Sequence, residues 1–508
     1  MNSFPAEVQE LVLSEYPLII AALVGYFVVF LLISVAAKRR LAEEAGDYIV
    51  ASRNLGWLVV TFTMFASVLS GVGMAGLPGT VYTFGAPFVV SMLAGNSVAA
   101  MLMWYLGPRI WVLGKHYQFT TPGDLLGEYY QSDTIRLYTV FASLLYNMAY
   151  IVAQLLAGGI LFNVLSGNTL SPGLGSAIIA VIVVVHVVSS GLRGIAWLDF
   201  FNGWLILAML AFYGVSILTV AGGAGGVIEG LGAIRDQFIT IPGLQGVYTP
   251  SYIYGIAIGL SLGSVVLSPS MWIRMYSARS KSYFAKISGM MLLLWGLAFV
   301  FGTFLIGTYG RTVFAEVESP DFISSLLAFK VMPAFFAALF LVAVLAAIIS
   351  TTDTYMHTLT ATVVRDLVRA VMWKGMDGSR EVRLNRIIII LVAAVGLLLA
   401  LSNPVLITPL AIFAGAITIQ LLTPLLGAVT WSRASTEAAL IAPAAGILLT
   451  LVWELGIVPY PFPAHILPGL ATAFFINVFL FVVVSLLTRP QSPEQVEKFH
   501  GLIARELP

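Results

Sequence analysis

Cysteine is absent from this chain of 508 residues, and charged side chains are scarce. Without cysteine the protein can form no disulfide, no thiolate metal site and no cysteine nucleophile. Charged residues make up 10% of the sequence, and the net charge of +1 provides no reason to expect a nucleic-acid partner. The five histidines are scattered without the spacing of a zinc hydrolase, so we do not expect an enzyme.

Apolar residues, in contrast, make up 59% of the chain. They form runs of about 20 residues, the length of a helix that crosses a hydrocarbon layer about 30 Å thick. The sequence therefore predicts an all-α polytopic membrane protein with about thirteen transmembrane helices. The predicted spans are 16–37, 56–80, 88–107, 137–165, 174–190, 196–220, 251–272, 284–310, 331–363, 385–402, 405–430, 435–457 and 466–488.

Basic residues are distributed unevenly between the predicted connections. If the N-terminus lies outside, all but Arg235, Arg311 and Lys330 of the 25 Lys and Arg residues fall in cytoplasmic segments. This asymmetry predicts a multi-pass protein of the inner or plasma membrane, with a short, charged cytoplasmic tail that begins at Arg489. Residues 1–15 contain acidic but no basic side chains, so we do not expect a cleaved signal peptide.

Two spans are interrupted near their centres by glycine, serine and proline. The interruptions cover residues 66–73 in the second span and 261–270 in the seventh. Unwound backbone inside a membrane is tolerated where it lines a cavity, and matched interruptions in two halves are typical of secondary transporters with inverted repeats. Small residues also allow helices to pack closely, which is the alternative explanation.

The interruptions suggest a division of the chain into four parts. Residues 1–55 form a peripheral first helix and a cytoplasmic link, and residues 56–220 form a first repeat of five helices. Residues 251–430 form a second, inverted repeat of five helices. Residues 431–508 supply two additional helices and the tail.

A polar cluster interrupts the ninth predicted span. Ser350, Thr351, Thr352 and Asp353 follow an apolar run. Because polar groups at membrane depth are costly unless they find partners, this cluster predicts a binding site.

Three motifs together resemble the sodium/solute symporter family, which includes carriers of proline, pantothenate, sugars, sialic acid and monocarboxylates. They are residues 66–71, the element 191–194 with Asp199 after it, and residues 347–351. The resemblance covers essentially the full length. It implies a leucine-transporter-type fold, a five-plus-five inverted repeat with two broken helices. It also implies a small-molecule substrate and the lipid bilayer as partners, with sodium as the coupling ion and no other cofactor. We find no sequence signal for an oligomeric state.

The resemblance further implies a sodium site between the second and ninth spans. Its ligands would be the backbone carbonyls of Ala66, Leu69 and Ala347 and the hydroxyls of Ser350 and Thr351. The chemistry agrees, because carbonyl groups released at a broken helix and the negative end of a half-helix both favour a cation. Bonds from the two hydroxyls back to their own helix are the alternative.

Two carboxylates have open roles. By resemblance, Asp199 would help sodium leave toward the cytoplasm or hold a second ion; otherwise it is a helix-end charge near Arg193. Asp353 and His357 are four residues apart on one helix, so we expect that they can hydrogen-bond and relay protons. Proton coupling is therefore kept as an alternative to sodium coupling.

The solute is expected beside the sodium site, between the two interruptions. Tyr150 matches a tyrosine of proline carriers, but Ser261 and Val265 stand where those carriers have aromatic residues. Residues 150–155 look more like the monocarboxylate and pantothenate branches. A half-helix N-terminus with serine hydroxyls suits a small carboxylate without a mid-span Lys or Arg, so we expect an organic acid. The candidate lining residues are Ser70, Gly71, Gly73, Tyr150, Gln154, Ser261, Ser264 and Ser268.

The sequence thus predicts a secondary active symporter that works by alternating access. A proton-coupled symporter and a transport-inactive solute sensor are the alternatives. A channel is disfavoured, because no charged ring or symmetric assembly is indicated.

Overall fold

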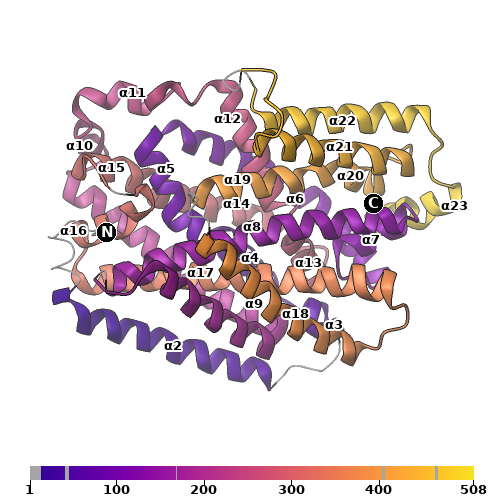
Figure 1. Ribbon diagram of the computed structural model, residues 1–508, viewed down its shortest axis with the longest axis horizontal. Coiled ribbons are helices and arrows are strands. Elements are labelled where there is room, and N and C mark those ends of the chain that lie inside the picture. The colour runs from indigo at the N-terminus through magenta and orange to yellow at the C-terminus, as the bar shows by residue number, and fades with distance from the viewer. Residues whose placement is uncertain are drawn as a thin grey trace.

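The computed structural model describes residues 13–39, 45–167, 169–317, 319–402, 407–463 and 467–507. Residues 1–12, which carry most of the expected acidic N-terminal stretch, lie outside the described residues. The described chain is mainly helical, and most long helices run along the horizontal axis of Figure 1. These helices are α2 (Tyr16–Lys38), α4 (Trp57–Val68), α6 (Pro87–Tyr117), α8 (Asp133–Leu165), α9 (Pro172–Ala221), α14 (Tyr283–Leu297), α17 (Ala334–Thr362), α18 (Gly378–Ser402), α19 (Ile407–Thr418), α21 (Thr436–Glu454) and α22 (Gly469–Leu487).

Shorter helical segments join the long helices or continue them. They include α3 (Ala45–Val50), η2 (Val72–Gly76), α5 (Leu77–Phe84), α7 (Pro122–Tyr129), α10 (Ala224–Glu229), α11 (Arg235–Ile239), α12 (Pro250–Ile256), η5 (Ala257–Gly263), α13 (Pro269–Ser277), η6 (Ala298–Phe304), α15 (Leu305–Val313), α16 (Ile323–Val331), η8 (Val363–Met372), α20 (Leu422–Val429), α23 (Pro493–Val496), η10 (Glu497–Gly501) and α24 (Leu502–Glu506).

Ten helices of the described chain are long and apolar enough to cross a membrane, or 11 if the bent pair after Trp57 is one span. The predicted fifth and sixth spans form one element, α9, whose 50 residues would reach about 75 Å if straight. A left-handed φ of 56° at Gly191 divides α9 into two helices. A Cβ at Gly191 would lie 2.8 Å from the Tyr48 ring, so glycine is required there. The predicted seventh span is divided between α12, η5 and α13, each too short to be counted alone.

Both predicted interruptions lie where the structure breaks its helices. The helix α4 ends at Val68, Leu69 leaves the helical region with a ψ of 71°, and the chain bends by 58° before it continues at Val72. In the second break, Ser268 is extended with a ψ of 138°, and Pro269 begins α13. Proline suits the first position of a helix, because its missing N–H would have no helical partner there.

Short polar side chains begin several of the membrane helices. The hydroxyls of Ser132, Ser171 and Ser435 accept hydrogen bonds from the backbone N–H three residues later, at the starts of α8, α9 and α21. Each cap satisfies a backbone donor that the helix itself leaves free.

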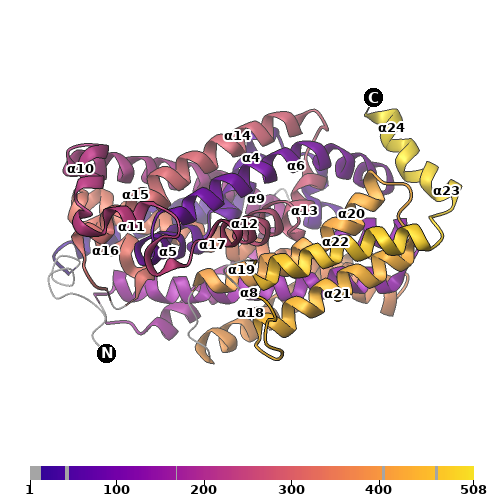
Figure 2. The ribbon, with the colours of Figure 1, turned by 90° about the horizontal axis from the view of Figure 1, so that it is seen from above.

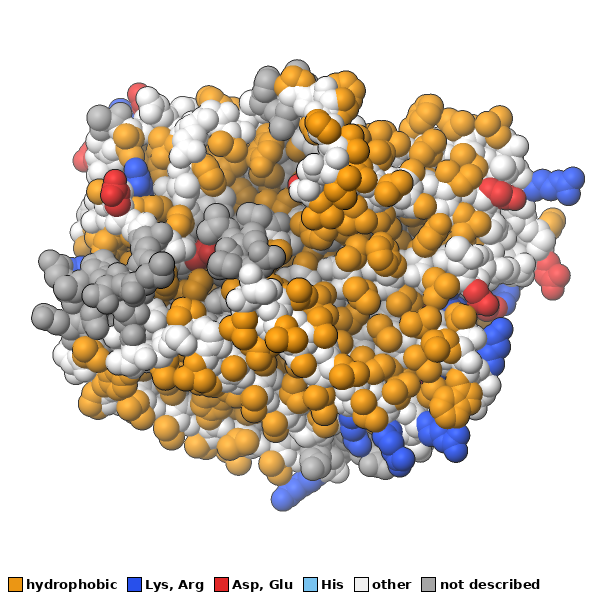
Figure 3. Space-filling model, in the orientation of Figure 1, with side chains coloured by type: hydrophobic (Ala, Val, Ile, Leu, Met, Phe, Trp, Pro, Cys, Tyr) orange, Lys and Arg blue, Asp and Glu red, His pale blue; other side chains and the backbone are white. Residues whose placement is uncertain are grey.

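The outer surface is apolar along the length of the helices. Figure 3 shows hydrophobic side chains over most of the visible face, with Lys and Arg gathered mainly at its right end. Leu32 on α2 and Leu398 on α18 are each 66% exposed. Surfaces of this kind are stable against lipid, and the chain is a multi-pass membrane protein.

The tail after Arg489 differs from the simple charged end that we expected. It folds into α23, η10 and α24, which lie beside the ends of α6 and α14 in Figure 2. Phe499 is fully buried, with its ring centroid 5.5 Å from that of Tyr117 and 5.1 Å from that of Tyr129. This aromatic packing could not be predicted from the sequence, because the rings that contact Phe499 are more than 300 residues away along the chain.

Backbone segments approach closely where η5 crosses α19. A Cβ at Gly263 would lie 2.0 Å from the carbonyl oxygen of Gly415, and one at Gly415 would lie 2.1 Å from that of Gly259. These glycines therefore set the distance between the broken seventh span and α19.

Replacing either contact glycine with alanine is expected to separate the two segments. Gly263→Ala and Gly415→Ala should each lower the free energy of unfolding by about 1–3 kcal/mol, because the added methyl overpacks a backbone contact. Gly289→Ala is the matched control, since no atom lies within 4 Å of its Cβ position. That variant should be neutral or slightly stabilising. Unfolding of the purified protein in mixed detergent micelles measures the difference; equal effects at all three positions would contradict it.

Candidate functional site

The break in α4 exposes carbonyl oxygens to a hydroxyl of α17. The Thr351 hydroxyl donates to the carbonyl oxygens of Ala66 at 3.4 Å and Ser67 at 3.2 Å. Leu69, at the break itself, is also buried, and so is Ala347, one turn before Thr351. The structure thus places the predicted ligands Ala66 and Thr351 in contact at the broken end.

Ser350 faces a carboxylate. Its hydroxyl donates to Oδ1 of Asp199 at 2.5 Å, and both residues are fully buried. A hydroxyl that donates its hydrogen keeps lone pairs that can bind a cation. Of the five predicted ligands, Ala66 and Thr351 are thus in direct contact between α4 and α17, while Ser350 is bonded to Asp199 of α9.

Arg274 lies inside this network, which contradicts its expected place among the cytoplasmic anchors. It is fully buried in α13, and its Nη2 donates to Oδ2 of Asp199 at 3.1 Å. Asp199 also accepts from Thr63 and has no contact with Arg193, which pairs instead with Asp47. The interpretation of Asp199 as a helix-end charge near Arg193 is therefore wrong.

Arg274 also donates hydrogen bonds to neutral oxygens on α4, α13 and α17. Nη2 also donates to the hydroxyls of Ser67 at 2.8 Å and Thr354 at 2.5 Å. Nε donates to Thr63 at 3.1 Å, and Nη1 to the Ser270 carbonyl at 3.3 Å. The sequence contained a signal that we missed: Thr63 with Ser67, and Ser350 with Thr354, are hydroxyl pairs spaced one helical turn apart on apolar helices.

Asp353 and His357 do not bond each other, so that part of the prediction is wrong. Asp353 Oδ2 lies 2.5 Å from Nδ1 of His186 on α9. His357 Nε2 instead meets the backbone carbonyl of Tyr48 at 2.9 Å. Side chains one turn apart can still point to different neighbouring helices, and here α9 and α3 supply the better partners.

The structure brings together some of the predicted solute residues. Gln154 Oε1 accepts from the Gly71 N–H at 2.8 Å, and the Tyr150 hydroxyl donates to Ser264 Oγ at 3.1 Å. The Gln154 amide nitrogen is buried without a hydrogen-bond partner in the described chain. These four residues connect the two breaks through α8.

The other four candidates make different contacts. Ser70 accepts from the N–H of Val72 in its own turn, and Ser268 pairs with Ser270 at the start of α13. Ser261 lies against Gly95 of α6, and Gly73 lies against the Leu69 side chain. Ser70, Ser261 and Gly73 are therefore not gathered with the others, whereas Ser268 also hydrogen-bonds with Tyr146, whose ring packs against Tyr150.

Two tyrosines that we did not predict join the ion and solute residues. The rings of Tyr146, Tyr150 and Tyr355 form a cluster with centroid distances of 4.9, 5.4 and 4.8 Å. Tyr355 donates to the Ser67 carbonyl at 3.5 Å, and Tyr146 donates to the Ser264 carbonyl at 3.3 Å. The cluster therefore bridges the broken ends of both interrupted spans.

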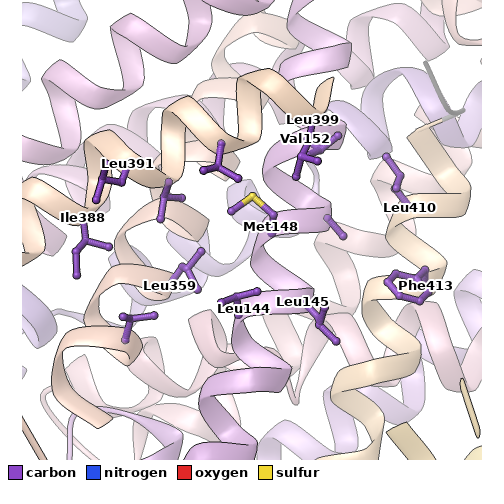
Figure 4. A pocket seen from close by; sticks show the side chains of 14 residues that line it. Leu144, Leu145, Met148, Val152, Leu359, Ile388, Leu391, Leu399, Leu410 and Phe413 are labelled. Carbon is purple, nitrogen blue, oxygen red and sulfur yellow. The ribbon is translucent and has the colours of Figure 1, made fainter. Parts of the chain in front are cut away.

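An apolar cavity bordered by α8, α17, α18 and α19 lies apart from this site. It has a volume of about 660 Å³, and all 14 lining side chains are apolar. Figure 4 shows Met148, Leu359, Leu391 and Phe413 pointing into it from α8, α17, α18 and α19. A cavity without a polar group offers no hydrogen bond to a small organic acid, so we do not assign the solute to it.

A smaller cavity of about 280 Å³ lies between the far halves of the broken spans. Its lining includes Thr80 of α5, Tyr248, Tyr252 of α12 and Asp321. It provides polar and aromatic groups on the side of the breaks opposite to Arg274.

Comparisons with known proteins identify the family and the fold of this chain. The model of the sodium:solute symporter family matches residues 48–446. The sodium/pantothenate symporter of Escherichia coli strain K12 is 28% identical over 85% of this chain and 90% of its own. The high-affinity proline transporter PutP of Bacillus subtilis strain 168 is 24% identical over 94% and 98%. The solved structure of a Na+-coupled sialic acid symporter, in a substrate-bound outward-open state, covers 94% of this chain and 98% of its own with a TM-score of 0.77 and 16% identity.

Removing one partner of the buried ion pair is expected to be strongly destabilising. Asp199→Asn and Arg274→Gln should each cost about 3–5 kcal/mol, because each leaves an uncompensated buried charge. The double variant should cost much less than the sum of the two. Arg505→Gln is the control, since Arg505 and its partner Glu497 are both mostly exposed, so its loss should cost little. Additive costs in a double-mutant cycle, measured by unfolding in mixed micelles, would show that the pair is not coupled.

Proposed function

The chain belongs to the sodium:solute symporter family, and on that premise we propose that it is a sodium-coupled symporter that imports a small organic solute by alternating access. The observation that supports this most directly is the contact of the Thr351 hydroxyl with the carbonyls at the broken end of α4. A broken helix with hydroxyls aimed at its freed carbonyls is the arrangement that binds sodium in transporters of this design.

The proposed sodium ligands are the carbonyls of Ala66, Leu69 and Ala347 and the hydroxyls of Ser350 and Thr351. Asp199, held by Ser350 and Arg274, is the proposed first station of sodium on its way to the cytoplasm. Because Asp199 is already paired with a cation, it can receive sodium only transiently, which suits an exit role better than a second permanent site.

An organic acid of the pantothenate or monocarboxylate type is the proposed solute. The pantothenate symporter of Escherichia coli has a higher identity to this chain than the proline transporter of Bacillus subtilis, 28% against 24%. Gln154, Gly71, Tyr150 and Ser264 are the residues proposed to meet the solute, and the unpaired Gln154 amide would donate to a carboxylate. Arg274 is at membrane depth, contrary to expectation, but its nitrogens are engaged by protein oxygens, so it is not the carboxylate's counter-charge.

The proposed architecture has thirteen spans and two inverted repeats, 56–220 and 251–430. The first helix and residues 431–508 lie outside these repeats, and the N-terminus is proposed to lie outside the cell. The division of α9 at Gly191 and of the seventh span at Ser268 supports this count.

Alternating access then has a physical basis in the network. The solute is proposed to enter through the cavity lined by Tyr248 and Asp321. Sodium and solute both contact the broken spans that the tyrosine cluster joins, so each stabilises the arrangement that the other needs. Such coupling is reciprocal: the factor by which sodium tightens solute binding equals the factor by which solute tightens sodium binding.

Proton coupling is the second candidate, and one observation favours it. Asp353 and His186 form a fully buried pair next to the proposed sodium hydroxyls. Ionisable groups inside a membrane commonly serve as proton relays. His357 bonds to a backbone carbonyl and is proposed only as a further member of that relay.

Sodium should stabilise the purified protein, and this effect should depend on two hydroxyls. We expect sodium, but not potassium at equal ionic strength, to raise the unfolding temperature of the wild type. Ser350→Ala and Thr351→Ala should lose most of this shift. Thr352→Ala is the matched control, because its hydroxyl bonds back to the Ile348 carbonyl of its own helix. If both site variants keep the wild-type sodium affinity, the ligand assignment is wrong.

Transport in proteoliposomes distinguishes the candidate functions. An inward sodium gradient should drive uptake of radiolabelled pantothenate or a short monocarboxylate above that of L-proline, and Gln154→Leu should raise KM at least tenfold by removing the amide. Uptake driven by an acid-outside gradient without sodium, and lost in Asp353→Asn, would identify a proton symporter. Sodium and solute binding without accumulation would identify a solute sensor.

A further inference from the structure

A third cavity lies just beyond the end of α13, where the C-terminal tail meets the ends of α6 and α14 (Figure 2). It belongs to the end of the molecule at which Lys and Arg gather in Figure 3. Its volume is about 490 Å³, within the range of small-molecule sites. The lining residues are Trp111, Val112, Lys115 and His116 of α6, Arg279, Ser280 and Lys281 of the turn before α14, and Leu502 and Glu506 of α24.

The cations around this cavity outnumber the carboxylates. Lys281 Nζ donates to Oε2 of Glu506 at 2.8 Å, and this pair is the one ion pair formed among the lining residues. Arg279 Nε donates to the neutral amide oxygen of Asn54 at 2.8 Å. Lys115 lies 4.8 Å above the Trp111 ring, and it forms no ion pair in the described part of the chain. Two positive charges therefore remain without an acidic partner.

The pKa of Glu506 is lowered by the hydrogen bond from Lys281 and by the positive charges around the cavity. Its hydrogen bond with Lys281 holds the pKa of the Glu506 carboxyl below its usual range, and the charges of Lys281, Lys115 and His116 act in the same direction. Glu506 lies on the tail, so a carboxylate of the tail pairs with one of the three cations that line the cavity.

The cavity lies at the level where a membrane helix ends. Lys115 and His116 are in the last turn of α6, which has 31 residues, and the Trp111 indole donates to the Ala278 carbonyl at 2.7 Å. Tryptophan and basic residues at the end of a span lie among lipid headgroups. Val112 and Leu502 provide apolar surface on the same wall.

We propose that this cavity binds the phosphate group of an anionic phospholipid, with Lys115, Arg279 and Lys281 as its cationic contacts and Glu506 as an internal competitor for Lys281. Basic cavities between transmembrane helices at a membrane surface are suited to phospholipid headgroups. A lipid with net negative charge gains from the unpaired cations, whereas a zwitterionic lipid brings its own positive charge. For Lys281 to bind the phosphate, its ion pair with Glu506 must break. Lipid binding is therefore linked to the position of the tail, which carries Glu506.

Native mass spectrometry of the full-length protein tests this site. We expect palmitoyl-oleoyl phosphatidylglycerol to bind more tightly than phosphatidylcholine with the same chains. Lys115→Gln, Arg279→Gln and Lys281→Gln should each weaken phosphatidylglycerol binding about fivefold, the factor for losing one cation near a lipid surface. Glu506→Gln should strengthen it, because the competing carboxylate is neutralised. A gain of affinity cannot arise from a damaged fold.

Lys286→Gln is the matched control, because Lys286 lies near the start of α14 but outside the cavity, above the Trp57 ring. This variant should bind like the wild type. Equal binding of the two lipids, an equal loss in Lys286→Gln, or no gain in Glu506→Gln would overturn the proposal. Displacement of the lipid by equimolar glycerol phosphate or inorganic phosphate would assign the site to a soluble phosphate and overturn the lipid assignment.

Discussion

A charged group inside a bilayer has to find its partners within the protein, because hydrocarbon supplies neither water nor counter-ions. Arg274 is the residue at which this requirement is strictest, since it is fully buried and donates from all three of its nitrogens. Its partners come from α4, α9, α13 and α17. The guanidinium thus joins α13, the second half of the broken seventh span, to the helices that carry the proposed sodium ligands. No single helix of this group can move without breaking a charge-assisted bond or carrying the others with it.

The broken helices are stabilised by the hydrogen bonds of Arg274 and by the small residues where η5 crosses α19. Helix breaks release carbonyl groups that would be unsatisfied in lipid, and here hydroxyls from neighbouring helices meet them. Thr351 and Tyr355 reach the Ser67 carbonyl from successive turns of α17. Tyr146 reaches the Ser264 carbonyl of the other break. The tyrosine hydroxyls therefore stabilise both breaks and connect them. A movement of the backbone at one break would alter the hydrogen bonds at the other.

Sequence patterns were sufficient for the features that are local along the chain. Apolar runs predicted the membrane helices, and glycine, serine and proline clusters predicted both breaks at the observed positions. The partners of the buried polar side chains, in contrast, are not neighbours along the chain. Asp353 was expected to meet His357 one turn away, but it meets His186 on α9, and Arg274 was assigned to the cytoplasm because it follows the seventh span by two residues. Which helix faces a side chain depends on packing between segments that are 75 to 167 residues apart, and no spacing rule contains that information.

The pairing of Arg274 with Asp199 also limits how the proposed site would bind sodium. Because the carboxylate is already balanced by the guanidinium, the proposed ligands offer an incoming sodium ion mainly the dipoles of carbonyls and hydroxyls. Neutral dipoles bind sodium more weakly than an unpaired carboxylate does. The ion can therefore dissociate once the site opens to a compartment low in sodium. The membrane potential then contributes about 2.3 kcal/mol per 100 mV for each net charge moved. A monovalent acid travelling with one sodium moves no net charge and would be driven by the sodium concentration gradient alone, whereas a neutral solute on the same site would also be driven by the potential. With one sodium ion per solute, the electrical response of transport would therefore distinguish a monovalent acid from a neutral solute.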